Sequence, residues 1–267
     1  MGGIAANSRM LDVAPIPAFR DNYIWLIRSA SDPRAVAVVD PGDAAPVLER
    51  LASEDLHLHA ILATHHHADH VGGARQLVEA TGAAVFGPGR ERLPVACTPL
   101  GGNDRVSLPA LGLAFAVIDV PGHTAGHIAY YGHDALFCGD TLFSAGCGRL
   151  FEGTAGQMLA SLDALAGLPD STRVFCGHEY TEANLRFAAA AEPGNADIGD
   201  YVRKVAEMRA AGRPSLPSTI GLEKRVNPFL RSRTENVKLS AERRAGRPLP
   251  TPVAVFAEVR SWKDMFQ

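Results

Sequence analysis

Short runs of hydrophobic residues, separated by turn residues, fill the chain from Leu11 to about Ala183. Such runs are typical of β-strands, and they predict strands at Tyr23–Ile27, Ala35–Val39, Ala60–Ala63, Ala83–Phe86, Leu113–Asp119, Ile128–Tyr131, Ala135–Cys138 and Arg173–Cys176. Hydrophobic residues at helical spacing predict helices between them, at Ala44–Ser53, Val71–Thr81 and Gln157–Ala166. Strands mixed with helices in this way indicate a layered α/β domain whose sheet is buried under helices.

The pattern changes after Tyr180. The following residues predict helices at Thr181–Ala191 and Asp200–Ala211, and one possible strand at Val253–Phe256. We therefore expect a domain boundary near residue 183. It divides the chain into a larger domain at residues 1–183 and a small, mostly helical domain at residues 184–267.

The distribution of charge supports this division. The net charge of the chain is −3, but residues 1–183 carry 11 Arg, no Lys and 20 acidic residues, whereas residues 184–267 carry 15 basic and 9 acidic residues. The two parts thus have net charges of −9 and +6, which suggests different tasks. The basic part lacks the dense runs of a nucleic-acid-binding arm, so a small anionic substrate is the better interpretation.

Composition excludes several classes of protein. No apolar run approaches the roughly 20 residues that span a bilayer, and the N-terminus lacks the pattern of a secretory signal. The four cysteines form no CxxC pair, which argues against a zinc–cysteine site or a disulfide scaffold. We therefore expect a cytoplasmic protein with neither a membrane nor a nucleic acid as its partner, and we expect a monomer.

The strongest chemical signal is a histidine-rich run that follows the predicted strand Ala60–Ala63. Four of the ten histidines lie between positions 65 and 70, and imidazoles grouped with a carboxylate suit Zn, Fe or Mn. In an extended segment His65 and His67 project to one side, whereas His66 points away. We therefore treat His65 and His67 as one ligand pair and His66 as a non-ligand.

A second ligand pair, Asp69 and His70, follows where the chain turns into the next helix. Two pairs in one loop favour two metal ions over one. Further metal-binding side chains follow three other predicted strands, each directly after a glycine: His123, Asp140 and His178. Functional residues of layered α/β proteins commonly gather at strand ends.

Other polar residues near these strands leave alternatives open. Asp40 is either a carboxylate that orients a ligand imidazole or part of an ordinary Asp-Pro-Gly turn. His127 is a candidate for supporting Thr124 or the nearby ligand loop. His57 and His59, which precede the histidine-rich run, are expected to be surface or structural residues.

Thr64–His70 resembles the HxHxDH signature of the metallo-β-lactamase fold superfamily. This resemblance implies an α+β fold, an αββα sandwich with metals at one edge, here with the small helical C-terminal domain. Within the superfamily, the chain from about Leu11 to Gln267 is similar to the hydroxyacylglutathione hydrolase (glyoxalase II) family. That similarity implies a first metal held by His65, His67 and His123, a second held by Asp69, His70 and His178, and Asp140 as the bridge between them.

A later loop carries part of the resemblance in substrate recognition. Phe143–Gly153 resembles the glutathione-contacting loop of this family, with Arg149 and Phe151 where the family usually has Lys and Tyr. Arg149 keeps a cation that can meet a carboxylate. Phe151 lacks the hydroxyl group, and with it one hydrogen bond to the substrate.

The end of the chain carries the rest of it. Residues 177–181 match the family's GHEYT motif, in which Tyr180 would contact the glutathione backbone. Arg260 and Lys263 match an RxxK pair whose cations bind the glycine carboxylate of glutathione in the family. On their own, two cations three residues apart would indicate a solvated helix face, but the whole tail agrees with the family.

The resemblance implies a thioester hydrolase of methylglyoxal detoxification that converts S-(2-hydroxyacyl)glutathione, such as S-lactoylglutathione, and water to glutathione and a 2-hydroxy acid. A metal-bridging hydroxide would attack the thioester, with Asp69 and Asp140 as the catalytic side chains. The implied cofactors are two divalent ions, zinc in the first place, with iron or manganese as alternatives. The competing hypotheses are another enzyme of this fold, such as a glutathione persulfide dioxygenase with a single iron, and a non-enzymatic module that binds metal or glutathione.

Overall fold

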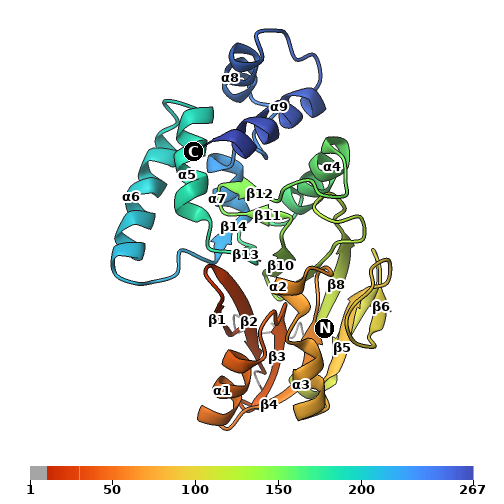
Figure 1. Cartoon of the computed structure of the whole chain (residues 1–267). Helices are drawn as coiled ribbons and strands as arrows, with labels where there is room; N and C mark the ends of the chain where they lie inside the picture. Colours follow the sequence, from red (N-terminus) through yellow and green to blue (C-terminus); the bar gives the residue numbers. More distant parts are fainter. Residues whose placement is uncertain (1–10, 30, 267) are drawn as a thin grey trace, which may run out of the picture.

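Two six-stranded β-sheets lie face to face in the centre of the protein (Figure 1). The computed structural model describes residues 11–29 and 31–266. The first sheet has the order β1 (Val13–Ala18), β2 (Asn22–Arg28), β3 (Ala35–Val39), β4 (His57–Leu62), β5 (Ala84–Pro88) and β6 (Thr98–Leu100). The second has the order β14 (Ser218–Thr219), β13 (Arg173–Cys176), β10 (Ala135–Gly139), β9 (Ile128–Gly132), β8 (Leu113–Asp119) and β7 (Arg105–Leu108). A short hairpin, β11 (Leu142–Phe143) and β12 (Gly146–Cys147), stands apart from both.

Helices cover the outer faces of the two sheets, so the layers are those of an αββα sandwich, as predicted. On the first sheet lie α1 (Ala45–Ser53) and α3 (Ala74–Thr81), while the short α2 (Ala68–Val71) lies beyond the end of β4. The core of the second sheet includes residues of α4 (Ala155–Ala166), α5 (Thr181–Ala191), α7 (Ile220–Val226), α8 (Glu235–Ala245) and α9 (Pro252–Met265). The remaining C-terminal helix, α6 (Ala196–Ala210), packs on α5 and α7. A 3₁₀ turn, η1 (Pro109–Leu111), precedes β8.

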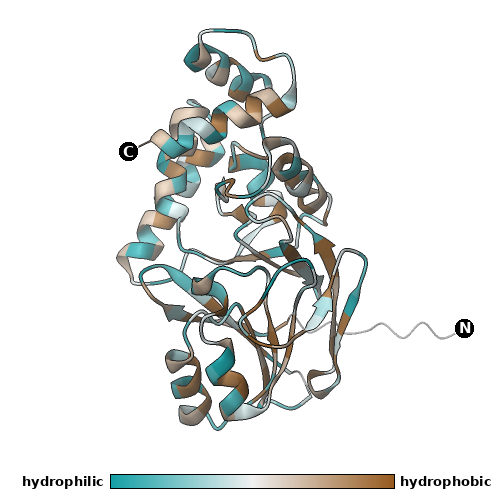
Figure 2. Ribbon diagram, turned by 45° about the vertical axis from the view of Figure 1, so that its right-hand side comes forward, coloured by the Kyte–Doolittle hydropathy of each residue, from teal (hydrophilic) through white to brown (hydrophobic). Residues whose placement is uncertain are grey.

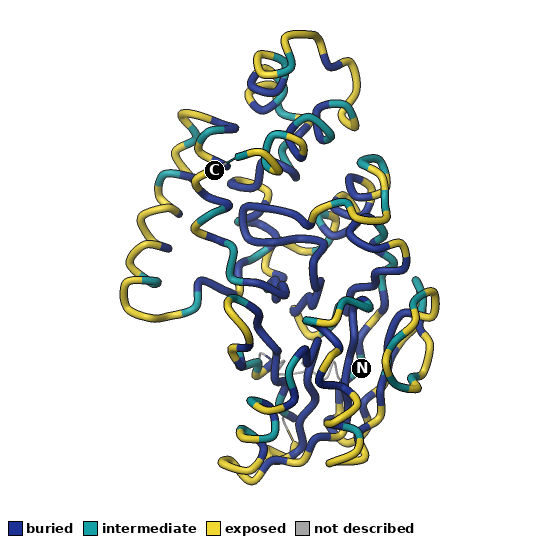
Figure 3. The backbone as a smooth tube through the Cα atoms, viewed as in Figure 1, coloured by how far each residue is buried: buried dark blue, intermediate teal, exposed yellow. Residues whose placement is uncertain are grey.

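The inner strands β2 and β3 of the first sheet are buried on both faces. In β2, Trp25 and Ile27 belong to the core between the two sheets, whereas Ile24 and Leu26 belong to the core under the outer helices. Successive side chains of a strand point to opposite faces, so a continuous hydrophobic run contributes to both cores. Figure 2 shows the brown hydrophobic strands in the interior, and Figure 3 shows the same segments as buried.

Several predicted elements have the predicted bounds: Ala35–Val39, Leu113–Asp119, Arg173–Cys176 and Thr181–Ala191. The predicted helix Val71–Thr81 begins too early: Val71 is the last residue of α2, Gly72 and Gly73 follow it, and α3 begins at Ala74. A Cβ on Gly73 would lie 2.4 Å from the backbone nitrogen of Ala44. The break therefore permits close contact with a neighbouring loop; Asp69 and His70 lie before it, in α2.

The prediction of a strand at Val253–Phe256 was wrong, because these residues lie in α9. Thr251 caps this helix by accepting a hydrogen bond from the backbone N–H of Ala254, and Pro252 occupies its first turn. Burial of Phe256 and Arg260, four residues apart, follows the helical period.

Some elements gave too weak a signal to be predicted. Strand β1 contains Pro15 and Pro17, and it lies at the edge of its sheet, where proline is tolerated. The strands β6, β7 and β14 are four residues long or shorter. Among residues 11–29 and 31–266, no helix is both long and apolar enough to cross a membrane.

Candidate metal centre and substrate cavity

The predicted metal-binding side chains meet where strands of both sheets end. His65 and His67 follow β4, and Asp69 and His70 lie in α2 directly afterwards. In the other sheet the contributors are His123 after β8, Asp140 after β10 and His178 after β13. Parallel pairing of β3 with β4 and of β10 with β13 places these ends side by side.

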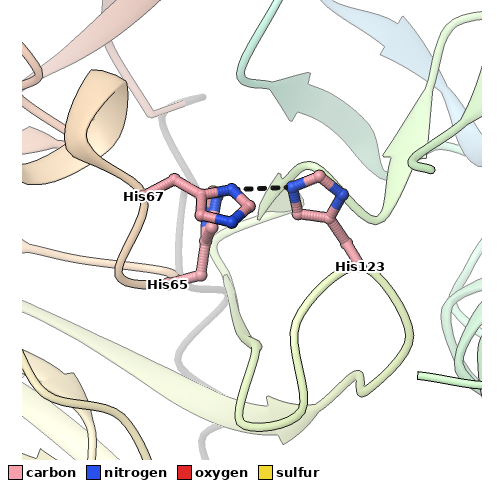
Figure 4. A group of neighbouring side chains, drawn as sticks. All are labelled: His65, His67 and His123. Carbon is pink, nitrogen blue, oxygen red and sulfur yellow. Dashed lines mark hydrogen bonds between the residues drawn. The ribbon is translucent and has the colours of Figure 1, made fainter. Parts of the chain in front are cut away.

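Three histidines form the first group, which we call the three-histidine cluster: His65, His67 and His123 (Figure 4). Nδ1 of His67 is 3.2 Å from Nε2 of His65 and 3.0 Å from Nε2 of His123. Burial lowers the pKa of all three imidazoles. The cluster thus presents neutral rings with nitrogen lone pairs that converge on one point, as metal binding requires.

The second group, the aspartate cluster, consists of Asp69, His70 and His178. Nε2 of His70 is 3.3 Å from Nε2 of His178, and Oδ2 of Asp69 is 3.5 Å from each of these nitrogens. One carboxylate with two imidazoles is again a donor set for Zn, Fe or Mn.

Asp140 lies between the two clusters. Its Oδ2 is 3.5 Å from Nε2 of His123 and 3.3 Å from Nε2 of His178, while its Oδ1 is 3.3 Å from Nε2 of His70. Burial raises the pKa of Asp140, but His70 and His178 outweigh this and hold it well below its ordinary value. Within the described part of the chain, the buried Oδ1 has no hydrogen-bond partner. A buried carboxylate oxygen without a partner is costly, and a cation between the clusters would satisfy it.

The donor set therefore fits two divalent cations. Buried imidazole nitrogens that face one another cannot all be paired by protons, whereas a metal ion accepts several of them at once. Asp140 and Asp40 raise the pKa of His70 despite its burial, so the centre favours positive charge at this position.

Two carboxylates outside the aspartate cluster contact its imidazoles at the ring nitrogens that face away from the cluster. Nδ1 of His70 lies 3.2 Å from Oδ2 of Asp40, which also accepts a hydrogen bond from the hydroxyl of Thr64. Nδ1 of His178 lies 2.8 Å from Oδ1 of Asp21. Such partners fix the orientation of a ligand imidazole. Of the two interpretations of Asp40, the structure supports the orienting carboxylate.

Two imidazoles of the three-histidine cluster have similar partners. Nδ1 of His65 is 3.0 Å from the hydroxyl of Thr64, and Nδ1 of His123 is 2.9 Å from the carbonyl oxygen of Arg149. Both rings therefore turn Nε2 toward the cluster.

His127 supports Asp140 and not Thr124. Burial lowers the pKa of His127 to about 3, so the ring is neutral near pH 7. Its Nε2 accepts a hydrogen bond of 3.2 Å from the backbone N–H of Asp140, and its Nδ1 donates to the carbonyl oxygen of Ile128. The ring also stacks on His65, with centroids 4.6 Å apart.

Two supporting residues gave no sequence signal. Asp21 holds His178, and Nδ2 of Asn22 donates to Oδ2 of Asp69 over 3.1 Å. Asp21 lies in the turn between β1 and β2, and Asn22 is the first residue of β2; Asp and Asn are common at such positions for local reasons alone. Only the folded chain brings this turn to residues 69 and 178.

A cavity of about 540 Å³ opens beside the two clusters. Besides metal-cluster residues, its lining includes all five predicted substrate contacts: Arg149, Phe151, Tyr180, Arg260 and Lys263. The Tyr180 ring stacks on the His178 ring at 4.7 Å. Phe151 is 63% exposed, and its centroid is 5.2 Å from that of His123.

The two cations of α9 that line the cavity have different hydrogen-bond partners. Arg260 is buried, and its guanidinium donates to the carbonyl oxygen of Cys147 at 2.9 Å and to Oδ1 of Asp264 at 3.0 Å. The ammonium group of Lys263 donates to the carbonyl oxygen of Ala183 at 3.1 Å. Burial, assisted by Arg260 and other nearby arginines, lowers the pKa of Lys263 to about 8.

The αββα layers and the paired clusters at one sheet edge define a protein of the metallo-β-lactamase superfamily, and the comparisons with known proteins agree. The family described as "Metallo-beta-lactamase superfamily" matches residues 18–96 and 98–178. The family described as "Hydroxyacylglutathione hydrolase C-terminus" matches residues 179–266.

Comparison with named relatives identifies the family within this superfamily. A hydroxyacylglutathione hydrolase of Nitrosomonas eutropha is 51% identical over 258 residues, which cover 97% of this chain and all of the relative. One from Albidiferax ferrireducens is 54% identical over 261 residues, with 96% of this chain and all of the relative covered. The chain belongs to the hydroxyacylglutathione hydrolase family, and it is therefore an enzyme of the hydrolase class.

Solved structures support the same fold. ETHE1 from Myxococcus xanthus is 28% identical, with a TM-score of 0.63 and coverage of 96% of this chain and 98% of that one. TTHA1623, solved in a di-iron-bound form, is 27% identical, with a TM-score of 0.57 and coverage of 82% and 99%.

Proposed function

We propose that this enzyme hydrolyses S-(2-hydroxyacyl)glutathione thioesters, with S-lactoylglutathione as the reference substrate, to glutathione and a 2-hydroxy acid. The observation that carries the proposal is the position of Asp140 between two metal-competent clusters, in a cavity that Arg260 and Lys263 also line. The cations suit an anionic peptide portion, and the clusters suit a reactive carbonyl.

We assign the metal ligands by cluster. His65, His67 and His123 would hold one divalent ion, Asp69, His70 and His178 would hold the other, and Asp140 would contact both. Bound there, the ions would supply a hydroxide nucleophile near neutral pH and stabilise the charge that develops on the thioester carbonyl oxygen. Zinc is our first assignment; iron and manganese suit the same donors, and the di-iron form of TTHA1623 supports iron as an alternative.

The protein's own side chains position the reactants. Oδ2 of Asp69, held by Asn22, faces both imidazoles of its cluster and can accept a hydrogen bond from the attacking water. No side-chain nucleophile is required, and Cys147 is unsuited to that role, because burial raises its pKa to about 11 despite the contact with Arg260.

The cavity wall would hold the peptide portion of the substrate. Arg260 and Lys263 would bind its glycine carboxylate, and Tyr180 would contact its backbone. Arg149 would add a cation at the exposed rim, where it lies 3.5 Å from Oδ1 of Asp264. These contacts would fix the thioester carbonyl near the clusters, while Phe151 leaves one polar contact unmade.

We further propose that residues 1–183 form the catalytic domain and that residues 184–267 form the unit that recognises glutathione. The net positive charge of residues 184–267 supports this division. A cytoplasmic location and a monomeric state stay predictions.

A spectrophotometric assay with S-lactoylglutathione tests the function. We expect metal-loaded protein to release glutathione, chelated protein to be inactive, and added Zn²⁺ to restore turnover. Absence of thioester hydrolysis by protein that holds two metals would contradict the proposal. Oxygen consumption with glutathione persulfide would favour the dioxygenase alternative, and glutathione binding without turnover would favour a binding module.

A further inference from the structure

A buried carboxylate outside both clusters connects the two chain segments that carry the three-histidine cluster. Glu91 lies beyond β5, and its side chain is 3% exposed. Its Oε2 lies 2.9 Å from Nδ1 of His66. Its Oε1 accepts hydrogen bonds from the backbone N–H of Gly126, at 3.0 Å, and from the hydroxyl of Thr124. One side chain thus fastens the segment of residues 65–67 to the loop that follows His123.

A second carboxylate repeats this connection from the other side. Oε2 of Glu152 accepts a hydrogen bond of 2.7 Å from the backbone N–H of Ala125, and Oε1 lies 3.5 Å from Nε2 of His66. Both ring nitrogens of His66 therefore face a carboxylate that also holds the loop of residues 124–126. Glu152 is 39% exposed, so the buried Glu91 is the stronger of the two links.

The packing around Glu91 leaves little freedom. A Cβ on Gly126 would lie only 2.6 Å from Cγ of Glu91 and 3.0 Å from Cβ of Arg90. A glycine is therefore required for the loop to approach this carboxylate. The close approach of the Gly126 backbone thus leaves the buried Glu91 side chain little room to move.

His67 is the member of the three-histidine cluster whose position depends most on this link. His65 and His123 have hydrogen-bond partners on the nitrogen that faces away from the cluster. Within residues 11–29 and 31–266, Nε2 of His67 has no such partner, and its Nδ1 is the atom that faces the cluster. The position of His67 thus depends on the backbone next to His66, which Glu91 holds.

We propose that Glu91, with His66 as its partner, is a positioning residue that sets the spacing of the three-histidine cluster, and that Glu152 assists it. This inference rests on the metal-ligand assignment of the proposed function. Loss of Glu91 frees the segment of His65 and His67 to move relative to His123. The aspartate cluster has its own carboxylate partners, Asp40 and Asp21, and is unaffected.

The test is a titration of metal-free protein with Zn²⁺ against a chromophoric chelator, which resolves the two binding events without reference to activity. In Glu91→Ala we expect one event to weaken by about 10- to 100-fold, the cost typical of losing a partner that orients ligands, and the other to stay unchanged. Glu91→Gln should restore most of the lost affinity, because its amide carbonyl can still accept from Thr124 and Gly126 while its NH₂ donates to His66.

Glu192→Ala is the matched control. Glu192 is also a buried carboxylate, but its partners Arg231 and Asn195 are not cluster residues. We expect this variant to lower the thermal unfolding temperature without changing either binding event. His66→Ala, at a side chain that is 34% exposed, provides a second variant should Glu91→Ala not fold, and it should weaken the same event to a smaller extent.

Two results would overturn the inference: two unchanged events in Glu91→Ala and His66→Ala, or equal weakening of both events in these variants. Failure of the proposed function has a different signature. Protein that binds two zinc ions but does not hydrolyse thioesters would remove the function and leave the role of Glu91 in metal affinity intact.

Discussion

The metal centre and the cationic wall of the cavity face the same space but are held in different ways. At the centre, the imidazoles of His65, His70, His123 and His178 each have a partner on the nitrogen that faces away from the cluster. At the wall, the three cations range from Arg260, which is 5% exposed, to Arg149, whose side chain is 65% exposed. The centre is one interlocked unit, joined by Asp140. At the wall, Arg260 and Arg149 share a contact with Asp264, but Arg260 and Lys263 otherwise bond to different carbonyl oxygens, those of Cys147 and Ala183.

This difference separates chemistry from binding. A change in a group that both clusters share, such as Asp140, disturbs the whole unit, so its effects are large and not additive. A change in a separate contact removes its own contribution to substrate binding and leaves the reacting groups in place. Substitutions in the two regions should therefore differ in which kinetic constant they change, as well as in magnitude.

The largest expected effect is that of Asp140→Asn. Asparagine preserves the shape of the side chain but removes the charge that lies within 3.3–3.5 Å of His70, His123 and His178. Loss of a partner that merely orients a ligand costs about 10- to 100-fold, so loss of the shared carboxylate should lower kcat by more than about 100-fold. Metal analysis should also find less than two ions per chain.

Asp170→Asn is a suitable control, since Asp170 is an exposed carboxylate that pairs with Lys224 on the surface. It should retain both metals and full activity. A variant at Asp140 with two bound metals and normal kcat would show that the centre is not one unit and would remove the contrast with the wall.

The next largest effect is expected for Arg260→Ala. Hydrogen bonds to a charged group contribute about 1.5–3 kcal/mol, so KM for the glutathione thioester should rise by about 10- to 100-fold, with much less change in kcat. The comparison substrate is a truncated thioester that lacks the glycine carboxylate. The variant and the wild type should hydrolyse it equally well.

Arg203→Ala is the matched control for loss of an arginine, because Arg203 is exposed on α6 and pairs with Asp200. It should leave KM unchanged. If Arg260→Ala raised KM equally for the full and the truncated substrate, Arg260 would support the hairpin at Cys147 and would not bind the carboxylate.

Much of the fold could be predicted because many of its strands are short hydrophobic runs with clear ends. Leu113–Asp119 and Arg173–Cys176 are examples, and both were predicted to the residue. The start of helix α9 was predicted as a strand, because the short run Val253–Phe256 also fits a strand. The signals for a helix are the residues just before this run, the capping residue Thr251 and Pro252 in the first turn. A run of four hydrophobic residues, two of them β-branched, is compatible with either structure until its neighbours are considered.

The candidate site divides in the same way. The histidine-rich run and the residues after glycines were detectable, because several metal-binding side chains in one pattern are rare. Their supports Asp21 and Glu91 were not, because a single acidic residue in a turn or loop is ordinary in sequence. Their roles arise from contacts between segments that lie far apart along the chain, Asp21 with His178 and Glu91 with Thr124.

A rise in pH should have a smaller effect on kcat/KM, through the cations of the cavity wall. The pKa of Lys263 is lowered to about 8, mainly by burial, so its cation is present below pH 8 and is lost as the pH rises above this value. Carboxylate binding should weaken accordingly, and kcat/KM, which reports the free enzyme, should fall between pH 7 and pH 9. Lys263→Arg, which keeps its charge throughout, should flatten this part of the profile. A decline of the same steepness in the variant would place the titrating group elsewhere, such as at the metal centre.

The smallest effect is expected from Phe151→Tyr, which restores the hydroxyl group usual in the family. The ring is exposed at the cavity mouth and lies near His67 and His123, so the added hydroxyl needs no repacking. A net hydrogen bond of about 0.5–1.5 kcal/mol should lower KM by about 2- to 10-fold without changing kcat or the metal content. The same kinetics with Phe151→Leu as with Phe151→Tyr would exclude a polar contact. A change in kcat would show that this ring belongs to the interlocked centre and not to the wall, and the border between the two regions would then lie between Phe151 and Arg149.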